Sequence, residues 1–315
     1  MEKHISVSQC LKTSILLLLT QFIILAWSVF GIQNDDLSIF RYFNYFGFFV
    51  MAITVANVFF FFFLNVKGSV NFVFYSFSLV ALLFQFIKFF PYYNGEAGYG
   101  DSNITVVSFS KMTLNKNLSK ITKIVDCSLY DVIMIQESFG MEPMGYKGCN
   151  SITNDKGSLS IYSRYNLVQT FDYGFAFGAS LKVGRKNIEF ITLRLDKTLS
   201  NNGYILHNKE VTKLLSYLKK SEYTHYVIGG DFNSTLFNST PKMFLRYADY
   251  MVAPSKWLFE STFPSNQRRI GMFGSMLRID HIFAKGFKVK NLEVSKNSYG
   301  SDHFPIIASL ELINY

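Results

Sequence analysis

The hydrophobic pattern divides the chain into two parts near residue 100. Residues 1–99 contain three long apolar runs, at 14–32, 42–64 and 70–90, and no charged residue lies in the centre of any of them. Each run approaches or exceeds the roughly 20 residues that a helix needs to cross the hydrocarbon core of a bilayer. Successive apolar helices without a polar face are not typical of a globular core. The pattern therefore predicts a membrane anchor with three transmembrane helices over 1–99.

Residues 100–315 instead alternate short apolar runs with segments of helical spacing. The helical spacing lies at 118–125 and 211–218, and the apolar runs that predict strands lie at 104–109, 131–135, 158–162, 179–183, 188–195, 225–228, 278–284, 288–294 and 304–312. Several runs are apolar throughout, which is typical of strands that are covered on both sides. We therefore predict an α/β fold, a four-layer α/β sandwich of two mixed β-sheets flanked by helices.

The distribution of charge supports this division. Only five of the 31 Lys and Arg residues and four of the 22 Asp and Glu residues lie in 1–99. The later part therefore carries most of the net positive charge, which favours an anionic partner. Charge alone does not choose between nucleic acid, a lipid headgroup and a small phosphoester.

The short polar flanks predict how the anchor is oriented. Lys3 and Lys12 precede the first apolar run, whereas Asp35 and Asp36 follow it. Positive residues favour the cytoplasmic side, so the N-terminus is expected there, and three crossings place the later part outside. We expect a multi-pass protein of the cell membrane, with the lipid bilayer as a partner and the domain at 100–315 on the extracytoplasmic side. No obligate protein partner is evident.

The three cysteines do not predict a disulfide-built scaffold or a zinc site. Cys10, Cys127 and Cys149 are few and are not spaced as metal ligands, so packing roles are expected. In an oxidising compartment Cys127 and Cys149 can pair if their geometry allows, and the sequence leaves this open.

Polar residues with catalytic chemistry follow or end several of the predicted strands. Rigid strand ends can hold such groups accurately enough for metal binding. Carboxylate oxygens without cysteine partners favour magnesium, manganese or calcium over structural zinc. The residues are Glu137, Asp231, Asn233, Asp280, Asp302 and His303.

These motifs resemble the endonuclease/exonuclease/phosphatase superfamily over roughly residues 103–313. The motifs are Ile-Gln-Glu, Gly-Asp-Phe-Asn, Arg-Ile-Asp-His and Ser-Asp-His-Phe-Pro, in the order and approximate spacing of that family. The resemblance implies a metal-dependent hydrolase over 100–315 that cleaves a phosphodiester or phosphomonoester by in-line attack of an activated water. It implies Mg²⁺ as cofactor, or Mn²⁺ or Ca²⁺.

The resemblance also assigns roles to the metal side and the water side of the site. Glu137 looks like the principal metal ligand, and Asp302 like a further metal-associated carboxylate. Asp231 resembles the residue that orients and deprotonates the attacking water, and Asn233 its hydrogen-bonding neighbour. Without the other motifs, a carboxylate after a strand or an Asx-type turn is the simpler interpretation of each.

A histidine with its carboxylate partner, and two departures from the family pattern, complete the comparison. His303 matches the residue that contacts the phosphate and supports the departing charge, and Asp280 matches the carboxylate that holds this histidine. Ser110 stands where the family usually has asparagine, and Arg194 where it often has histidine or tyrosine. Both are candidate substrate contacts, although Arg194 paired with a neighbouring carboxylate is equally consistent with the sequence.

The sequence leaves the substrate open between a lipid headgroup, a small phosphoester and nucleic acid. A tether beside the outer leaflet favours lipid phosphodiesters, which it meets at high effective concentration. An aromatic-rich segment from Tyr247 to Phe263, with Trp257 and Phe259, precedes Arg268 and Arg269. This segment can insert into lipid, stack on bases or pack. The alternatives are a nuclease acting on extracytoplasmic nucleic acid and a catalytically inactive binding module of the same fold.

Overall fold

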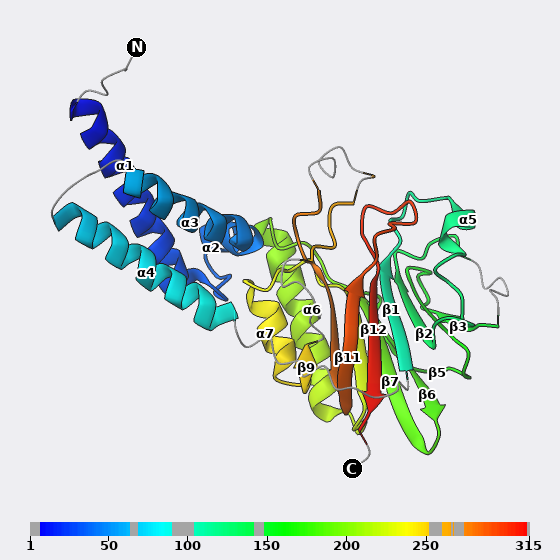
Figure 1. The fold of residues 1–315 in the computed structure, drawn as a ribbon. Helices are drawn as coiled ribbons and strands as arrows, with labels where there is room; N and C mark the ends of the chain where they lie inside the picture. Colours follow the sequence, from blue (N-terminus) through cyan, green and yellow to red (C-terminus); the bar gives the residue numbers. More distant parts are fainter. Residues whose placement is uncertain are drawn as a thin grey trace. The chain divides into compact units, whose positions relative to one another are not determined.

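The chain forms two compact units. The computed structural model describes residues 7–63, 69–89, 104–141, 148–251, 260–265, 267 and 274–313. The helical unit consists of Met1–Pro91 together with Leu236–Ser239, and the sheet unit of Tyr92–Thr235 together with Thr240–Tyr315. Figure 1 shows the helices of the first unit in blue and cyan and the strands of the second from teal to red. The predicted boundary at 91–103 lies outside the described residues.

Among the described residues of the helical unit, two helices are long and apolar enough to cross a membrane. They cover Lys12–Gly31, with a mean hydropathy of 2.1, and Asn71–Lys88, with a mean hydropathy of 1.5. These correspond to the first and third predicted spans. The elements are α1 Val7–Ala26, continued by a π-helical turn at Trp27–Gly31, α2 Ser38–Tyr45, α3 Gly47–Phe63 and α4 Ser69–Phe89.

The predicted second span at 42–64 is not one continuous helix. α2 and α3 meet at a bend of 79°, so three spans are reached only if this bent pair is one of them. The helix leaves regular geometry at Phe46, and Gly47 follows. A Cβ atom on Gly47 would lie 2.3 Å from the ring of Phe237. Close approach therefore requires glycine here, and glycine also weakens a helix.

Polar side chains join the helices inside the unit. Gln21 of α1 donates to Ser78 of α4 at 2.7 Å, and Gln85 of α4 donates to Ser28 at 2.9 Å. All four side chains are buried. Such hydrogen bonds between helices contribute to helix association in lipid, where exposed polar groups are costly.

Asp35 is a buried carboxylate in the loop before α2. Its Oδ1 accepts from Asn44 and from Asn238, each at 2.9 Å. Its Oδ2 accepts from the backbone nitrogen and the hydroxyl of Ser239, each at 2.7 Å. Asp35, which the sequence analysis uses to predict the orientation of the helices, therefore holds Leu236–Ser239 by hydrogen bonds.

The sheet unit contains two mixed sheets. The first has the order β11-β12-β1-β2-β4-β3, with β1 Ile104–Ser110, β2 Val132–Gln136, β3 Asn150–Thr153, β4 Leu159–Ser163, β11 Phe287–Val294 and β12 Ile306–Leu312. The second has the order β5-β6-β7-β8-β10-β9, with β5 Val168–Asp172, β6 Ala176–Val183, β7 Lys186–Arg194, β8 Tyr226–Asp231, β9 Tyr250–Met251 and β10 Asp280–Lys285. β1–β2 and β7–β8 are parallel pairs, and β12 and β10 join them antiparallel.

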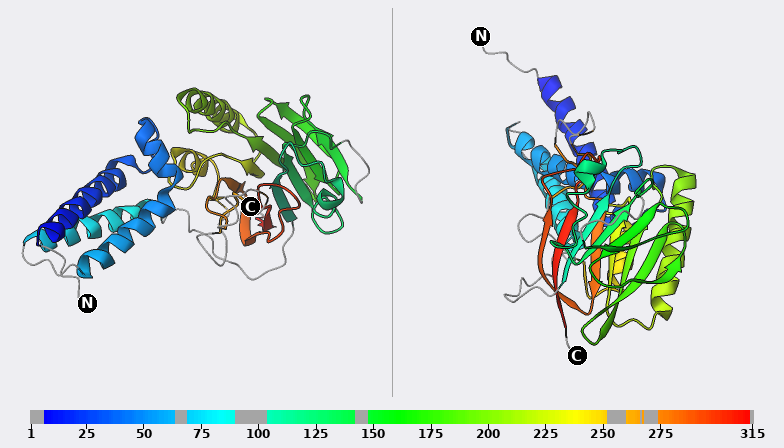
Figure 2. Two further views of the ribbon diagram at one scale, coloured as in Figure 1. Left: turned by 90° about the horizontal axis from the view of Figure 1, so that it is seen from above. Right: turned by 90° about the vertical axis from the view of Figure 1, so that its right-hand side faces the viewer.

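Both faces of the central strands are buried, as the apolar runs predict. Val106, Met134 and Phe190 lie in a core cluster with residues from both sheets. On the other face of the first sheet, Phe109 and Ile133 belong to a second cluster that includes side chains around α5. The sheets face each other in Figure 2, so the prediction of two mixed sheets with helices is confirmed.

The helices of the sheet unit differ in length from the prediction. Figure 2 shows α6 on the outer side of the second sheet. It extends beyond 211–218 because Ser200 caps its N-terminus by accepting from the Gly203 nitrogen at 3.0 Å. α5 is shorter than 118–125 and forms a single turn. The bounds are α5 Leu118–Ile121, α6 Asn201–Lys220 and α7 Ser239–Leu245.

The structure settles the pairing that the sequence left open, because Cys127 and Cys149 form a disulfide across a 22-residue separation. Closing such a loop restricts the unfolded chain and contributes about 3 kcal/mol in the entropic description. We expect the double replacement Cys127→Ala, Cys149→Ala to lower the free energy of unfolding by about that amount. Urea unfolding of the full chain in detergent measures this. A reductant should destabilise the wild type but not the double variant, and a reductant without effect on either would contradict the prediction.

Glu189 predicts a pH dependence of stability. Its side chain is fully buried in β7, and Tyr217 donates to it at 2.5 Å. Burial raises the pKa of Glu189 above its ordinary value. The folded state then holds the proton more tightly than the unfolded state, so stability is highest below the ordinary pKa and falls as pH rises through the folded value.

Glu189→Gln cannot ionise but can still accept from Tyr217. The variant and the wild type should therefore unfold at similar temperatures near pH 4, and the variant at a higher temperature near pH 8. Circular dichroism melts across this range measure the difference, with Glu222→Gln, an exposed position, as the matched control. A variant that is less stable at both pH values would show that the fold requires the carboxylate.

Candidate active site

The sheet registers bring the predicted residues to the same end of the two sheets. Ser110 at the end of β1 pairs with Gln136 at the end of the parallel strand β2, directly before Glu137. Arg194 at the end of β7 pairs with Asp231 at the end of β8. Asp231 is also opposite Asp280 across the antiparallel pair of β8 and β10. Local strand pairing therefore assembles residues that lie far apart in the sequence.

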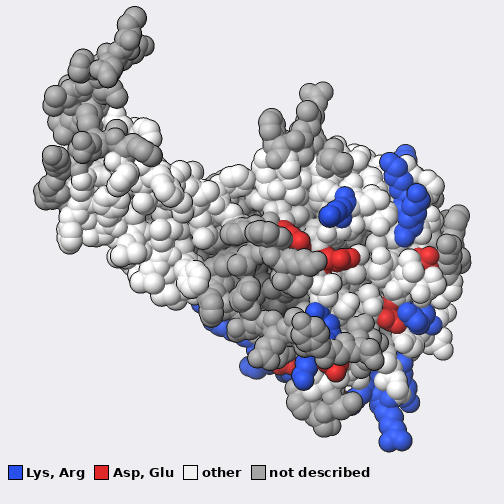
Figure 3. Space-filling view, viewed as in Figure 1, with Lys and Arg blue, Asp and Glu red and all other residues white. Residues whose placement is uncertain are grey.

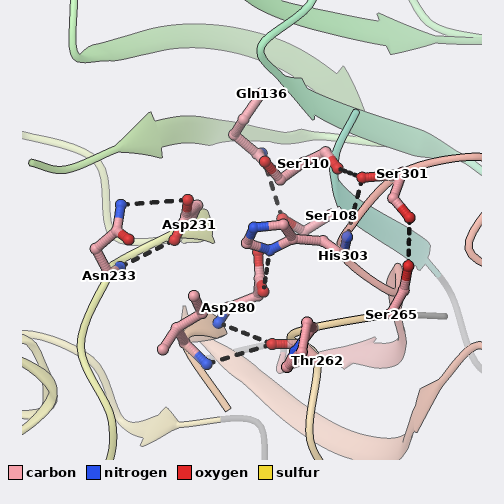
Figure 4. Close-up of polar contacts among 12 residues, drawn as sticks. Ser108, Ser110, Gln136, Asp231, Asn233, Thr262, Ser265, Asp280, Ser301 and His303 are labelled. Carbon is pink, nitrogen blue, oxygen red and sulfur yellow. Dashed lines mark hydrogen bonds and ion pairs between the residues drawn. The ribbon is translucent and has the colours of Figure 1, made fainter. Parts of the chain in front are cut away.

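Asp231, Asp280 and His303 form a buried group. One ligand atom from each lies within 4.8 Å of the others, and all three side chains are at most 6% exposed. His303 Nδ1 lies 2.8 Å from Asp280 Oδ2. Figure 4 shows this contact, with Asp231 and Asn233 beside it. Backbone nitrogens of Ile279 and Asp280 lie 3.3 Å from the Thr262 hydroxyl, which fixes the strand end.

The surrounding carboxylates set the charge of His303. Burial acts to lower the pKa of His303, but Asp280, Asp231 and Asp302 outweigh it and raise the pKa to about 9. The imidazole is therefore protonated near neutral pH and can donate a proton. The ring of Phe263 lies 4.9 Å from that of His303, so this member of the aromatic-rich segment packs in the site. Trp257, Phe259, Arg268 and Arg269 lie outside the described residues.

Asn233 orients Asp231. Its backbone nitrogen donates to Asp231 Oδ1 at 3.0 Å, and its side-chain amide lies 3.3 Å from Asp231 Oδ2 and 2.7 Å from the Leu195 carbonyl. Asn233 has a φ of 47°, a conformation that asparagine adopts more readily than most residues. Burial raises the pKa of Asp231, and the Asp280 charge adds to this effect. A raised pKa makes the ionised carboxylate a stronger base.

Glu137 lies outside the group of three and is held by two neighbours. Oε2 accepts from the backbone and hydroxyl of Thr113 at 2.6 and 2.5 Å, and Oε1 accepts from Arg194 Nε at 2.8 Å. Burial acts to raise the pKa of Glu137, but the Thr113 hydrogen bonds and the Arg194 charge outweigh it and lower the pKa. The carboxylate is thus ionised. Its φ of 56° is unusual for glutamate, and such strain is concentrated at functional sites.

The structure adds one observation on Arg194, which the sequence analysis considered, and one on Thr113, which it did not. The pairing of Arg194 with a carboxylate, one of its two interpretations, is observed, and the carboxylate is that of Glu137. Thr113 contacts the predicted metal ligand but belongs to no motif. It lies in the segment after β1, and no sequence signal marks it.

Ser110 and Asp302 are both buried. The Ser110 hydroxyl is buried and has no hydrogen-bond partner among the described residues. A buried hydroxyl in this state can contact a ligand, since leaving it unpaired is costly. Asp302 is 6% exposed, and its charge acts on His303. Figure 4 shows Ser301 bonding to the Ser110 carbonyl and to the His303 nitrogen, which positions this loop.

The histidines His207, His225 and His281, predicted as surface or packing residues, are all buried. His281 Nε2 lies 2.7 Å from the Ser234 carbonyl, and burial lowers the pKa of His281 to about 3. It is therefore a neutral packing residue behind the Asp231 loop.

Comparisons with known proteins identify the family and the fold of the chain. The model of the Endonuclease/Exonuclease/phosphatase family matches residues 110–303. No curated protein sequence matches the chain. Among solved structures, a 3′ phosphatase from Neisseria bound to product DNA hairpin is 14% identical, with a TM-score of 0.54, and the match covers 66% of this chain and 99% of the other.

Two further structures are similar. The 3′-5′ exonuclease from Neisseria meningitidis is 14% identical with a TM-score of 0.52, covering 66% of this chain and all of that one. A mannosyl-6-phosphatase from Bacteroides thetaiotaomicron is 18% identical with a TM-score of 0.50, covering 66% and 99%. These likenesses show the fold. Because the family match spans more than half of the chain, the protein belongs to the endonuclease/exonuclease/phosphatase family, whose members are hydrolases acting on phosphoester bonds.

Proposed function

We propose that the protein is a membrane-anchored, divalent-metal-dependent phosphoesterase that hydrolyses its substrate by in-line attack of an activated water. The observation that carries the proposal is the buried group of Asp231, Asp280 and His303, with one ligand atom from each within 4.8 Å of the others. A structural ion pair needs only one acidic and one basic side chain. This group instead has two buried carboxylates beside a protonated histidine. Such an arrangement is suited to proton transfer in both directions.

The residues fit a divalent cation. Glu137 supplies an ionised carboxylate, Asp302 a buried one, and Ser110 a hydroxyl with no hydrogen-bond partner among the described residues. These hard oxygen donors suit Mg²⁺, Mn²⁺ or Ca²⁺. When bound, the cation would offset negative charge that develops on the phosphoryl group.

The proton transfers are assigned to the chain's own side chains. Asp231, held by Asn233, accepts a proton from the attacking water on a carboxylate oxygen. His303, held at Nδ1 by Asp280, donates a proton to the departing oxygen from its other ring nitrogen. Arg194 neutralises part of the charge at Glu137 and has further donors on its guanidinium for a phosphate oxygen.

Three observations support a place in the cell membrane with the sheet unit outside the cytoplasm. The helical unit has two helices of 20 and 18 residues with the length and composition of spans. On the face in Figure 3, its described surface is largely free of charged residues, unlike that of the sheet unit. The Cys127–Cys149 disulfide fits an oxidising compartment, because such bonds are rare in the cytosol.

Hydrolysis of aryl phosphate esters tests the proposed function. The full chain in detergent micelles is offered an aryl phosphodiester and an aryl phosphomonoester with Mg²⁺, Mn²⁺ or Ca²⁺, beside His303→Ala. We expect metal-dependent hydrolysis that falls about 10²–10⁴-fold in the variant, the usual effect of losing a general acid. Equal rates in both proteins would exclude the mechanism. No hydrolysis with any metal would favour an inactive binding module, and parallel assays on phospholipid vesicles and DNA separate the natural substrate classes.

A further inference from the structure

A cavity of about 230 Å³ lies beside Glu137 in the sheet unit. It is smaller than the roughly 300–1,000 Å³ of pockets that take drug-sized ligands, so it has room for one small ring. Its wall is built by separate elements: the β3–β4 turn, the start of β6, the end of β7 and the middle of α6. The residues used below are Glu137, Lys156, Phe175, Arg194, Asp196 and Glu210.

The charges around the cavity alternate in sign. Arg194 is paired with Glu137 at 2.8 Å, which leaves Lys156 facing a region that also contains Asp196 and Glu210. An anionic group would meet the carboxylates of Glu137 and Asp196 and the carboxyl group of Glu210, whose pKa burial raises to about 7. A cationic group would meet two basic side chains. An uncharged group avoids repulsion by the acidic and by the basic side chains, since desolvated like charges repel strongly. Hydroxyl groups fit best because each both donates and accepts hydrogen bonds.

Lys156 and Glu210 lie at the cavity wall. Glu210 Oε2 accepts from the Asp196 backbone nitrogen at 2.9 Å. Lys156 extends along Gly174, where an added Cβ atom would lie 3.0 Å from the ammonium nitrogen. Gly174 has a φ of 79°, which favours glycine at this turn. Glu210 is therefore oriented by a backbone hydrogen bond, whereas Lys156 is an exposed donor close to this turn.

Phe175 gives the cavity one apolar side. Its ring is stacked on Tyr173 with centroids 6.1 Å apart, and Lys213 lies 3.9 Å from the centroid of Tyr173. A saturated ring carrying hydroxyls has apolar C–H faces and a polar rim. Such a ring can pack against an aromatic side chain while its hydroxyls reach the charged groups.

We infer that this cavity binds an uncharged polyhydroxyl ring, a sugar or a cyclitol, that forms part of the phosphoester substrate. The inference rests on the proposed function for the position of the phosphate, which is beside Glu137. Lys156 donates to ring hydroxyls and Glu210 accepts from them, so these two residues determine specificity without taking part in the bond cleavage.

Binding without turnover tests the cavity first. The full chain in detergent with EDTA is titrated by calorimetry with myo-inositol, methyl mannoside, choline and inorganic phosphate. We expect a polyol to bind, with Lys156→Ala and Glu210→Gln each raising its Kd about tenfold, the effect of losing a hydrogen bond to a charged group. Lys209→Ala and Glu222→Gln, both exposed, should leave the Kd unchanged. Tighter binding of choline or phosphate than of either polyol would overturn the inference.

A kinetic arm identifies the source of the ring. Soluble inositol phosphate and mannose phosphate are compared with vesicles of phosphatidylinositol and of phosphatidylcholine. Lys156→Ala should raise KM for the polyol ester that is cleaved, soluble or lipid-linked, and leave hydrolysis of an aryl phosphate unchanged. If phosphatidylcholine is cleaved equally well and Lys156→Ala has no selective effect, the inference fails. Hydrolysis of the aryl ester without polyol binding contradicts this inference alone, whereas polyol binding without hydrolysis of any ester contradicts the proposed function alone.

Discussion

Asp231→Asn is expected to lower kcat/KM for an aryl phosphodiester by about 10²–10⁴-fold, the range for removal of a general base. Asparagine has nearly the same shape and can still accept from the Asn233 backbone nitrogen, which donates to Asp231 at 3.0 Å. What it lacks is a carboxylate that can take the proton of the attacking water. The loss should therefore appear in kcat rather than in KM.

The matched control for Asp231→Asn is Asp155→Asn, which removes one carboxylate from an exposed position of the same unit. Steady-state rates with metal in excess give the comparison, and thermal unfolding shows whether each variant is folded. A folded Asp231→Asn protein that retains more than about a tenth of the wild-type rate would remove Asp231 from the mechanism, because even weak base catalysis exceeds this factor.

Removal of divalent metal is expected to have the second large effect. Under the proposed function, a cation bound at Glu137 would supply several kcal/mol of charge stabilisation, so chelation should lower the rate by about 10³-fold or more. Added Mg²⁺, Mn²⁺ or Ca²⁺ should restore it. Glu137→Gln should raise the metal concentration required for half-maximal rate, because a neutral amide binds a hard cation less well than the ionised carboxylate.

Glu222→Gln is the matched control for Glu137→Gln, since it removes the same charge at an exposed position. Metal titrations of the initial rate compare the two variants with the wild type. Full activity after exhaustive chelation would contradict the metal dependence. An unchanged metal requirement in Glu137→Gln would instead indicate that other residues bind the metal. Asp302 is the first of these to test.

The sequence predicted the buried strands because their apolar runs are a strong signal, and it missed those that are short or partly exposed. β3 has no buried position, β5 has one, and β9 has only two residues. The bend before α3 was missed for a different reason. The predicted apolar run 42–64 continues across Phe46 and Gly47, and the side chain that requires the glycine, Phe237, lies far away in the sequence.

The site was predictable where residues occur in motifs and not where they come from turns or helices. Asp231 ends β8, Asp280 begins β10 and His303 precedes β12, all within motifs that the sequence shows, and the structure brings them together. Thr113 and Glu210 carry no such mark, because a threonine in a turn and a glutamate on an amphipathic helix are common in any protein. Their positions follow only from the three-dimensional packing around Glu137 and the cavity.

The contacts of Asp35 mean that the helical unit is not formed by the N-terminal part of the chain alone. Leu236–Ser239 comes from the middle of the sequence that forms the sheet unit, yet it belongs to the helical unit. During synthesis, that unit stays incomplete until residue 239 has been made, long after its own helices. A chain cut at the linker would leave Asn238 and Ser239 without their carboxylate acceptor. Both units should therefore be expressed and purified within one continuous chain.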